Sequence, residues 1–473
     1  MGDALLQFYH RLPVPLRSVA ASLRGCQLRH WRYGHETGRL VAEALARESW
    51  SLDRWTAWQQ QTLGRLLHRA ATQVPYYREH WSARRRAGDA APWTELSKWP
   101  VIDKEAVRAN PMAFIAEDCS LNAMFRDQTS GTSGKPLSIW FERRAVRQWY
   151  ALFEARLRLW NGVSRHERWA ILGGQLVVPI SANTPPFWVW NAPMHQLYLS
   201  SFHLSRRNAP AYANALNKYG VTHLVGYSSS IATLARDFEE LGLEVKGLKV
   251  VLTNAEPLFP WQRTLIARVL KTDVRETYGM AEAVLGASEC PAGRLHVWPD
   301  AGGLEVLDDT EDVPVTDGDV GRFVCTGLIN HAMPLIRYAV GDRGSISPEN
   351  QACACGRRLP VINRIEGRTN DMITTPDGRR VYWLNSVFYG LPVTQAQIVQ
   401  DKLDRIRIKL VPGPGFTSGT RSLLSERLKM RVGDIRIVVE LVDDIPRSAN
   451  GKFRAVVSQV SRDDIPDLAT TLA

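Results

Sequence analysis

The 473-residue chain is 45% hydrophobic and 23% charged, as is typical of a folded protein, and its length predicts two or more domains. Its formal net charge is +11, but Lys and Arg are scattered and no helix-turn-helix, zinc-finger or RNA-binding motif accompanies them. We therefore expect no nucleic-acid partner, but a solvated basic surface or a phosphate-rich small-molecule substrate. No apolar run reaches the roughly 18 residues of a membrane span, and six cysteines in so long a chain suggest no disulfide framework, so we expect a cytoplasmic protein.

The first 120 or so residues are expected to be helical. The stretch "TAWQQQTLGRLLHRAATQVPYYREHW" carries apolar residues at helical spacing. The first 34 residues are basic and interrupted by Pro13 and Pro15, without the long apolar run of a signal peptide. We interpret them as part of the folded protein and leave open an amphipathic contact with a membrane surface.

Alternating strand and helix patterns follow from about residue 120 to 345. Short β-rich runs such as "RWAILGG", "THLVGY" and "LKVVLTNAE" alternate with helical patterns such as "SSSIATLARDFEELG". This alternation favours βαβ units. We predict an α/β protein with a large N-terminal domain, residues 1–366, of mostly parallel sheets flanked by helices. A small mobile α+β C-terminal domain, residues 367–473, should follow.

Residues 127–138 read "DQTSGTSGKPLS", a glycine- and hydroxyl-rich run between two expected strands. The Walker P-loop places its loop between a strand and a helix, and the spacing from Gly131 to Lys135 is too short for that motif. Taken alone, the run is more often an ordinary turn than a phosphate site. Backbone N–H groups, hydroxyls and one ammonium at close range would nevertheless suit a polyphosphate.

Six motifs in order resemble those of the adenylate-forming superfamily, which includes acyl-CoA synthetases and peptide-synthetase adenylation domains. They are "TSGTSGKP" (129–136), "NAEPL" (254–258), "ETYGMAE" (276–282), "IRYAVGD" (336–342), "EGRTNDMI" (366–373) and "PRSANGKFR" (446–454). The segments "ATQVPYYREHW", "LSKWPVIDKEAVRANP" and "CACGRRLP" resemble the phenylacetate–CoA ligase branch and its capsular-polysaccharide-type relatives. With these segments the resemblance covers nearly the whole chain.

The resemblance implies that a carboxylic acid attacks ATP to give an acyl-adenylate and pyrophosphate, after which a nucleophile, commonly CoA, displaces AMP. It assigns the β- and γ-phosphates to Thr129, Ser130, Gly131, Thr132, Ser133, Gly134 and Lys135. It assigns the adenosine and the remaining nucleotide contacts to Asn254, Ala255, Glu256, Pro257, Thr277, Tyr278, Gly279, Met280, Asp342 and Arg368.

The same resemblance makes Glu282 the ligand of a Mg²⁺ ion and Lys452 the lysine of the adenylation step, with a hinge at Asp371. Each residue also has an ordinary alternative, such as a core tyrosine, a surface glutamate or a solvated loop lysine. The sequence departs from the family pattern at Ala281, where a hydroxyl is usual.

Four further residues suggest a structural metal. Cys290 and His296 lie in "CPAGRLH", and Cys353 and Cys355 form "CAC". Three thiolates and an imidazole suit tetrahedral Zn²⁺, and related ligases carry cysteines at this place, although buried unligated thiols remain the alternative.

The acid and its acceptor are left open by the sequence. The acyl pocket is expected near residues 225–231, with Trp188, Trp190 and His195 as candidate lining residues, and aromatic, arylacetic and aliphatic acids all remain candidates. The acceptor is expected to be CoA, with an amine or a carrier-protein thiol as the alternative. A non-catalytic nucleotide-binding protein is disfavoured by the presence of Lys452, and a homodimer is left open.

Overall fold

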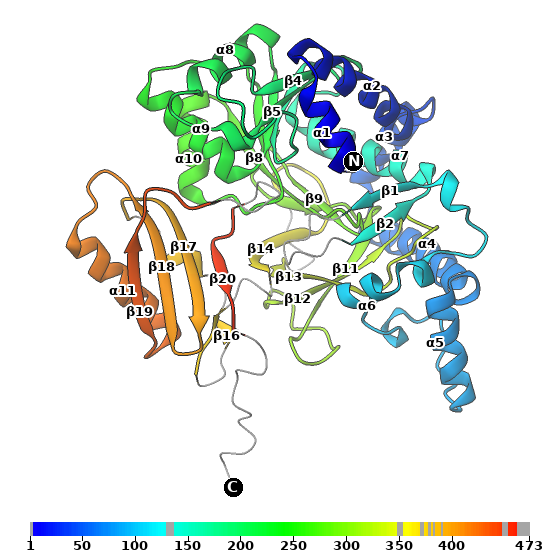
Figure 1. The fold of residues 1–473 in the computed structure, drawn as a ribbon. Helices are drawn as coiled ribbons and strands as arrows, with labels where there is room; N and C mark the ends of the chain where they lie inside the picture. Colours follow the sequence, from blue (N-terminus) through cyan, green and yellow to red (C-terminus); the bar gives the residue numbers. More distant parts are fainter. Residues whose placement is uncertain are drawn as a thin grey trace. The chain divides into compact units, whose positions relative to one another are not determined.

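The computed structural model describes residues 3–128, 137–347, 353–368, 373–376, 380–381, 384–388, 391–446 and 453–460 (Figure 1). The chain divides into two compact units. The first comprises Met1–Val340 and Ser345–Arg364, and the second Gly341–Gly344 and Ile365–Ala473. The expected phosphate-binding residues 129–135, Asp371 and Lys452 lie outside the described residues. Among the helices that are described, none is long and apolar enough to cross a bilayer.

The first unit begins with helices, as the apolar spacing predicts. They are α1 (Asp3–Arg11), α2 (Val14–Arg32), α3 (Thr37–Ala46), α4 (Leu52–Gln73), α5 (Pro75–Arg86) and α6 (Lys104–Ala109). The Ser51 side chain caps α4 by accepting a hydrogen bond from the Arg54 backbone N–H, 3.3 Å away. α4 buries Trp55, Leu66 and Ala70, which recur at helical spacing. Pro75 opens α5, where its missing N–H costs no intrahelical hydrogen bond.

A hairpin of two short strands brackets the glycine-rich run. β1 (Phe125–Gln128) pairs antiparallel with β2 (Ser138–Phe141), which confirms the two strands expected on either side of the run. Next comes α7 (Arg143–Leu152), which continues as a π-helical turn over Phe153–Arg158.

A parallel sheet region forms the centre of the first unit. The strands β3 (Trp169–Gly173), β5 (Gln196–Ser200), β6 (His223–Gly226), β7 (Val250–Thr253) and the first half of β8 (Asp273–Gly279) run parallel to their neighbours. Their connections include α8 (Ala209–Tyr219), α9 (Ser228–Glu240) and α10 (Pro260–Leu270). All residues of β6 and β7 are buried, as expected for parallel strands covered on both faces.

The complete sheet is mixed, so the expectation of mostly parallel sheets holds only for its central part. Within the described residues its order is β11-β12-β13-β14-β10-β9-β8-β7-β6-β3-β5-β4. β4 (Trp188–Asn191) and β9 (Gly286–Glu289) pair antiparallel with β5 and β8. The others are β10 (Leu295–Val297), β11 (Gly302–Leu307), β12 (Gly321–Gly327), β13 (Tyr338–Ile346) and β14 (Val361–Arg368). Among the described residues between β8 and β14 there is no helix, and connections without a crossover helix join antiparallel strands.

The second unit is a small α+β fold, as its sequence pattern predicts. Its strands are β15 (Ile373–Thr374), β16 (Arg380–Val381), β17 (Val393–Lys402), β18 (Arg405–Pro412), β19 (Arg436–Leu441) and β20 (Val456–Ser458). The four larger ones form a mixed sheet in the order β19-β18-β17-β20. Helix α11 (Ser418–Val432) buries Leu424, Leu428 and Val432, which share a core with Ile406 and Ile408 of β18.

Candidate nucleotide site and metal cluster

Most of the described nucleotide residues follow parallel strands β7 and β8 of the first unit. Asn254 follows β7, and Tyr278 and Gly279 close β8. Ser228 lies just beyond the neighbouring strand β6, at the first residue of α9. Since carboxyl ends of parallel strands meet at one edge, these residues converge in the place where open α/β sheets bind their ligands.

The segment after β7 is held by hydrogen bonds from α9. The backbone N–H of Ser229 donates to Glu256 Oε2 at 3.1 Å, and the Ser228 hydroxyl donates to the Pro257 carbonyl at 2.7 Å. Ala255, between Asn254 and Glu256, has φ +61°, a left-handed conformation that costs energy for a residue with a Cβ. Exposed Ala255 and Pro257 and half-buried Asn254 and Glu256 therefore form a fixed turn beside the strand ends.

Asn254 carries an unused hydrogen-bond acceptor. Its backbone N–H donates to the Gly226 carbonyl at 3.0 Å. Its side-chain Oδ1, in contrast, is buried and has no hydrogen-bond partner within the described part of the chain. Because a buried amide oxygen without a partner costs free energy, this atom is suited to a ligand N–H donor such as the amino group of a purine.

A half-buried glutamate, Glu276, supports the same turn from β8. Its Oε1 accepts a hydrogen bond from the Leu258 backbone N–H at 3.2 Å. Burial raises the pKa of Glu276 to about 7, and this hydrogen bond only partly opposes the effect. On the next residue, the Thr277 hydroxyl donates to the Thr253 carbonyl at 2.8 Å and ties β8 to β7.

Glu282 lies just after β8, and its carboxylate is buried between a cation and a phenol. Lys104 Nζ and Tyr338 Oη each lie 2.9 Å from its Oε1. The Glu282 side chain is 5% exposed and that of Lys104 30%. A fixed and partly neutralised carboxylate at the end of β8 can offer oxygen ligands to a hard cation such as Mg²⁺.

The two partners of Glu282, Lys104 and Tyr338, were not predicted from the sequence. Lys104 opens α6, which Asp103 caps by accepting from the Ala106 backbone N–H at 2.8 Å. The preceding Ile102 pairs with Tyr338 in an isolated parallel bridge, which brings Lys104 and Tyr338 to Glu282. The available signal was their position inside the segments "PVIDKEAV" and "IRYAVGD", both of which carry the family resemblance.

A cavity of about 210 Å³ lies between the end of β1 and the residues that follow β8. Its wall is rich in aromatic side chains from α2, the hairpin and α7, and it includes Met280, Ala281 and Asp127. The aromatic residues that line it are Trp31, Phe125, Phe141, Trp149 and Tyr150. The expected lining residues Trp188, Trp190 and His195 are not among those that line it, and the Trp190 ring stacks instead on Tyr219.

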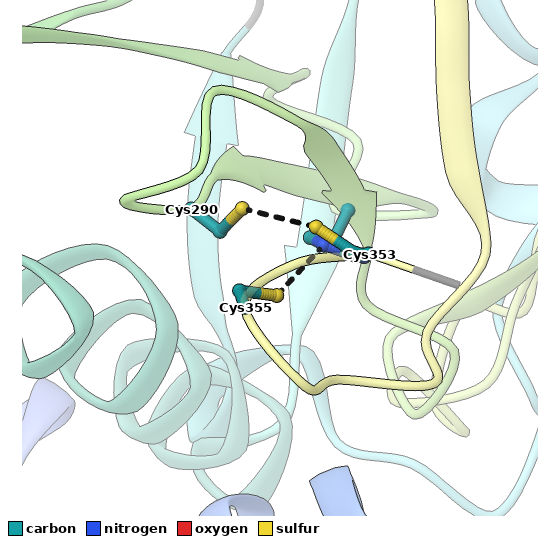
Figure 2. Close-up of side chains that lie close together, drawn as sticks. Cys290, Cys353 and Cys355 are labelled. Atoms are coloured by element: carbon teal, nitrogen blue, oxygen red, sulfur yellow. Dashed lines mark hydrogen bonds between the residues drawn. The ribbon is translucent and has the colours of Figure 1, made fainter. Parts of the chain in front are cut away.

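The structure brings together Cys290, His296, Cys353 and Cys355, and Figure 2 labels the three cysteines. The ligand atoms of the four residues all lie within 4.8 Å of one another. Cys290 Sγ is 3.7 Å from Cys353 Sγ, and Cys355 Sγ is 3.4 Å from His296 Nε2. Cys290 follows β9, His296 is on β10, and the loop before β14 supplies the other two.

The environment of this Cys₃His cluster fits a divalent metal. His296 Nδ1 is 3.0 Å from the Leu359 carbonyl, which turns Nε2 toward the thiols. Burial lowers the pKa of His296, so the imidazole stays neutral as a ligand must. Burial also raises the pKa of Cys290 to about 11, a cost that a bound cation would offset. The set can hold Zn²⁺, and its packing against Trp55 and Trp160 favours a structural role.

Comparison with known proteins supports the family. Residues 373–459 match the CapK C-terminal domain. CapK of Staphylococcus aureus is 25% identical over 393 residues, which are 81% of this chain and 85% of CapK. Phenylacetate–CoA ligase of Thermus thermophilus is 30% identical over 259 residues, which are 48% of this chain and 57% of that enzyme.

The chain is therefore a distant homologue, at 25% and 30% identity to these two relatives, of the adenylate-forming ligases of the phenylacetate–CoA ligase and CapK branch. Its fold agrees with this placement. A 2-hydroxyisobutyryl-CoA ligase in complex with an acyl-AMP superposes with a TM-score of 0.68 at 20% identity, over 88% of this chain and 92% of that ligase.

The remaining ligase motifs are only partly described. Asp342 lies half-buried in β13, and Arg368 is the last residue of β14. Tyr278 is half-buried, with its ring edge-on to Phe323 at 6.1 Å. The roles assigned to these residues, to the phosphate-binding run and to Lys452 stay predictions.

Proposed function

We propose that this ligase activates a carboxylic acid with ATP and then transfers the acyl group to CoA. In the first step a carboxylate oxygen attacks the α-phosphorus, the bond to the β-phosphate oxygen breaks, and pyrophosphate leaves. In the second step the CoA thiolate attacks the acyl carbonyl, a thioester forms, and AMP leaves with the former carboxylate oxygen. Both steps depend mainly on positioning and on stabilising negative charge.

The observation that carries the proposal is the unused Oδ1 of Asn254 at the carboxyl ends of the parallel strands. An adenine amino group would supply the missing donor. Tyr278 would stack on the ring, and the turn Ala255–Pro257 would border it. Asp342 would accept hydrogen bonds from the ribose hydroxyls, and Arg368 would approach the ribose or the phosphates.

Several groups would bind the phosphates and offset their negative charge. The run Thr129–Lys135, which lies outside the described residues, would bind the β- and γ-phosphates. Glu282, held in place by Lys104 and Tyr338, would be the protein ligand of a Mg²⁺ that neutralises phosphate charge. Lys452 would stabilise the charge that builds at the α-phosphate.

The cavity beside Met280 and Ala281 is our candidate for the acid. Its volume of about 210 Å³ is below the roughly 300–1,000 Å³ of typical drug-sized ligand sites, which favours a small acid. Its aromatic wall favours an aromatic or arylacetic acid over a long aliphatic one. Relatives named as phenylacetate–CoA ligases support the same substrate class.

An acceptor other than CoA is the alternative, because residues 373–459 match the CapK C-terminal domain and the name CapK specifies no CoA chemistry. An amine or a carrier-protein thiol would use the same adenylate and differ only in the second step. The expected location is the cytoplasm, where ATP and CoA are available.

A pyrophosphate-release assay across a panel of carboxylic acids tests the first step. We expect release with at least one small aromatic acid in the presence of MgATP. The same panel with CoA, and separately with amines, identifies the acceptor by the product formed. No pyrophosphate with any acid would contradict the proposal.

A further inference from the structure

Helix α2 packs on the protein through a small and polar face. Ser18 Oγ accepts a hydrogen bond from the Trp190 backbone N–H at 3.2 Å, and Ser22 Oγ accepts one from the Ala192 N–H at 3.2 Å. Gly25 is buried, and a Cβ there would collide with the Asn191 side chain. A surface helix usually turns its apolar stripe toward the protein and its polar face toward water. In α2 this order is reversed.

The outward face of α2 is apolar. Leu16, Val19 and Leu23 are 48%, 53% and 69% exposed. They lie three and seven residues apart, so they form one stripe along the helix. Such a stripe has no partner in the described part of this chain.

Helix α1 adds to the same surface region, since α1 and α2 lie together at the edge of the first unit (Figure 1). Tyr9 Oη donates to the Val177 carbonyl at 2.9 Å, and His10 Nε2 lies 2.8 Å from the Leu176 carbonyl. These contacts fix α1, yet Leu5 and Phe8 remain 57% and 63% exposed. We call Leu5, Phe8, Leu16, Val19 and Leu23 the N-terminal apolar surface.

Exposed apolar residues are concentrated in these helices. Among the described residues, seventeen large apolar side chains are exposed, and six of them belong to α1 and α2, which make up only residues 3–11 and 14–32. Scattered single residues would need no explanation, but a cluster of this kind marks an interaction surface.

The charges around the apolar surface identify its partner. Residues 3–32 contain five arginines, no lysine and no glutamate, and Asp3 is their one acidic residue. Arg17 and Arg24 directly follow Leu16 and Leu23, so they flank the stripe about 100° around the helix. Apolar residues flanked by arginines match the interface of an anionic lipid membrane. A symmetric contact between two copies would instead bring the arginines beside the stripe, Arg17 and Arg24, close to those of the second copy.

We propose that α1 and α2 dock this protein on an anionic membrane surface. The N-terminal apolar surface enters the boundary between headgroups and acyl chains, and the flanking arginines pair with lipid phosphates. The inference does not depend on which acid or acceptor the enzyme uses.

Flotation of the full chain with lipid vesicles tests the proposal. We expect binding to vesicles of phosphatidylglycerol and phosphatidylcholine in equal parts to be at least about tenfold tighter than binding to pure phosphatidylcholine. Raising the salt concentration from about 0.05 to about 0.5 M should weaken it, because the Debye length shortens.

Two matched pairs of variants separate the apolar and the charged contributions. Leu16→Ser with Leu23→Ser should reduce binding to anionic vesicles about tenfold or more, whereas Leu241→Ser with Val313→Ser, also exposed, should leave it within about twofold. Arg11→Gln with Arg24→Gln should weaken binding, whereas Arg207→Gln with Arg358→Gln, which removes the same charge elsewhere, should not. Pyrophosphate release and thermal melting should be unchanged in the Leu16 and Leu23 variant, which shows that it is folded.

Two results would overturn the proposal. One is wild-type protein that does not bind anionic vesicles, or binds them as well after the Leu16 and Leu23 changes. The other is a protein that does not bind vesicles but sediments as a dimer, and whose dimer dissociates when Leu16 and Leu23 are changed. The N-terminal apolar surface would then join two copies of the chain.

Discussion

Lys104 Nζ lies 2.9 Å from Oε1 of Glu282, although the two residues are 178 positions apart in the sequence. The glutamate is nearly inaccessible to solvent, so its orientation depends on this cation and on the Tyr338 hydroxyl. The pair links the helical N-terminal region to the segment after β8 that we assign to nucleotide binding.

Replacing Lys104 by Met should therefore lower both stability and adenylation. Loss of one partner leaves a buried carboxylate without its cation, which should reduce the free energy of unfolding by about 1–3 kcal/mol. Pyrophosphate release should fall about 10- to 100-fold because Glu282 is no longer held. Denaturant unfolding and the pyrophosphate assay measure the two effects, and Lys98→Met, at an exposed lysine nearby, is the control.

A double-mutant cycle tests whether Lys104 acts through Glu282. Glu282→Gln alone should reduce pyrophosphate release about 10²- to 10³-fold, the scale for losing a charge-stabilising group. In the Glu282→Gln variant, adding Lys104→Met should reduce pyrophosphate release only a little further, because the effects of mutating residues that act as a unit are not additive. Fully additive losses would mean that the lysine acts elsewhere.

Asn254→Ala should weaken ATP binding specifically. Removal of the unused acceptor takes away one hydrogen bond to the adenine amino group, which corresponds to about 1 kcal/mol and a KM for ATP raised about 5- to 10-fold. The KM for the acid should not change. Thermal stability should not fall, since the side-chain Oδ1 has no partner to lose within the described residues. Equal changes in both KM values would contradict the adenine assignment.

The cysteine cluster predicts about one zinc per chain in the purified protein by elemental analysis. Cys353→Ser or Cys355→Ser should remove most of it. At a free zinc concentration about 1,000 times the Kd of the site, the bound metal would contribute about 4 kcal/mol to the free energy of unfolding. The variants should lose a large part of that contribution. Cys26→Ser, an exposed cysteine outside the cluster, should keep the metal. A folded protein without zinc would show that the thiols are unligated.

The pKa of Glu276 predicts how stability changes with pH. Burial raises it from 4.5 in the unfolded chain to about 7 in the folded protein, so between these values the folded state binds more protons. This contribution to stability is therefore complete below about pH 4.5 and is lost as the pH rises through about 7.

Glu276→Gln, which cannot ionise, should remove that loss. The variant should gain stability relative to the wild type between pH 5 and pH 8 in urea unfolding. Glu244→Gln, at an exposed residue, is the control, and its difference in unfolding free energy from the wild type should be nearly constant between pH 5 and pH 8. The hydrogen bond from Lys271 lowers the pKa of Glu244, so this carboxylate stays charged over that range. If the difference in unfolding free energy between Glu276→Gln and the wild type does not change with pH, the Glu276 carboxyl is already ionised at pH 5 in the folded protein.

Local patterns in the sequence predicted many of the helices and strands, because apolar spacing and turn residues act over a few positions, and the family resemblance gave the order of the motifs. They identified the helical N-terminus and the two strands on either side of the glycine-rich run, whereas the four metal-cluster residues were predicted from their ligand types and from the family resemblance. The partners of Glu282 were missed because the bridge between Ile102 and Tyr338, which brings Lys104 close, joins distant segments. The antiparallel half of the sheet was missed because the turn-rich segment after β8 shows strands without showing their pairing.

The reversed face of α2 could not be predicted for a similar reason. Helical periodicity shows that Leu16, Val19 and Leu23 share one side, but not which side faces the protein. Hydrogen bonds from the edge of the sheet to Ser18 and Ser22 decide that.

The sharpest prediction for the catalytic cycle concerns Lys452 and Asp371, both outside the described residues. If the second unit rotates at Asp371, as the family resemblance implies, Lys452 contacts the α-phosphate only during adenylation. Lys452→Ala should then reduce adenylate formation by about two to four orders of magnitude. Acyl transfer from a chemically supplied acyl-adenylate should be nearly unchanged.

Asp371→Pro should show a different pattern, because proline fixes φ and would hold the unit in one pose. One half-reaction should be spared and the other lost. Lys402→Ala, at an exposed lysine on β17, serves as the control for both measurements and should leave each half-reaction unchanged. If Lys452→Ala slows adenylation and transfer equally, the lysine is structural, and a mechanism with two alternating poses is wrong for this enzyme.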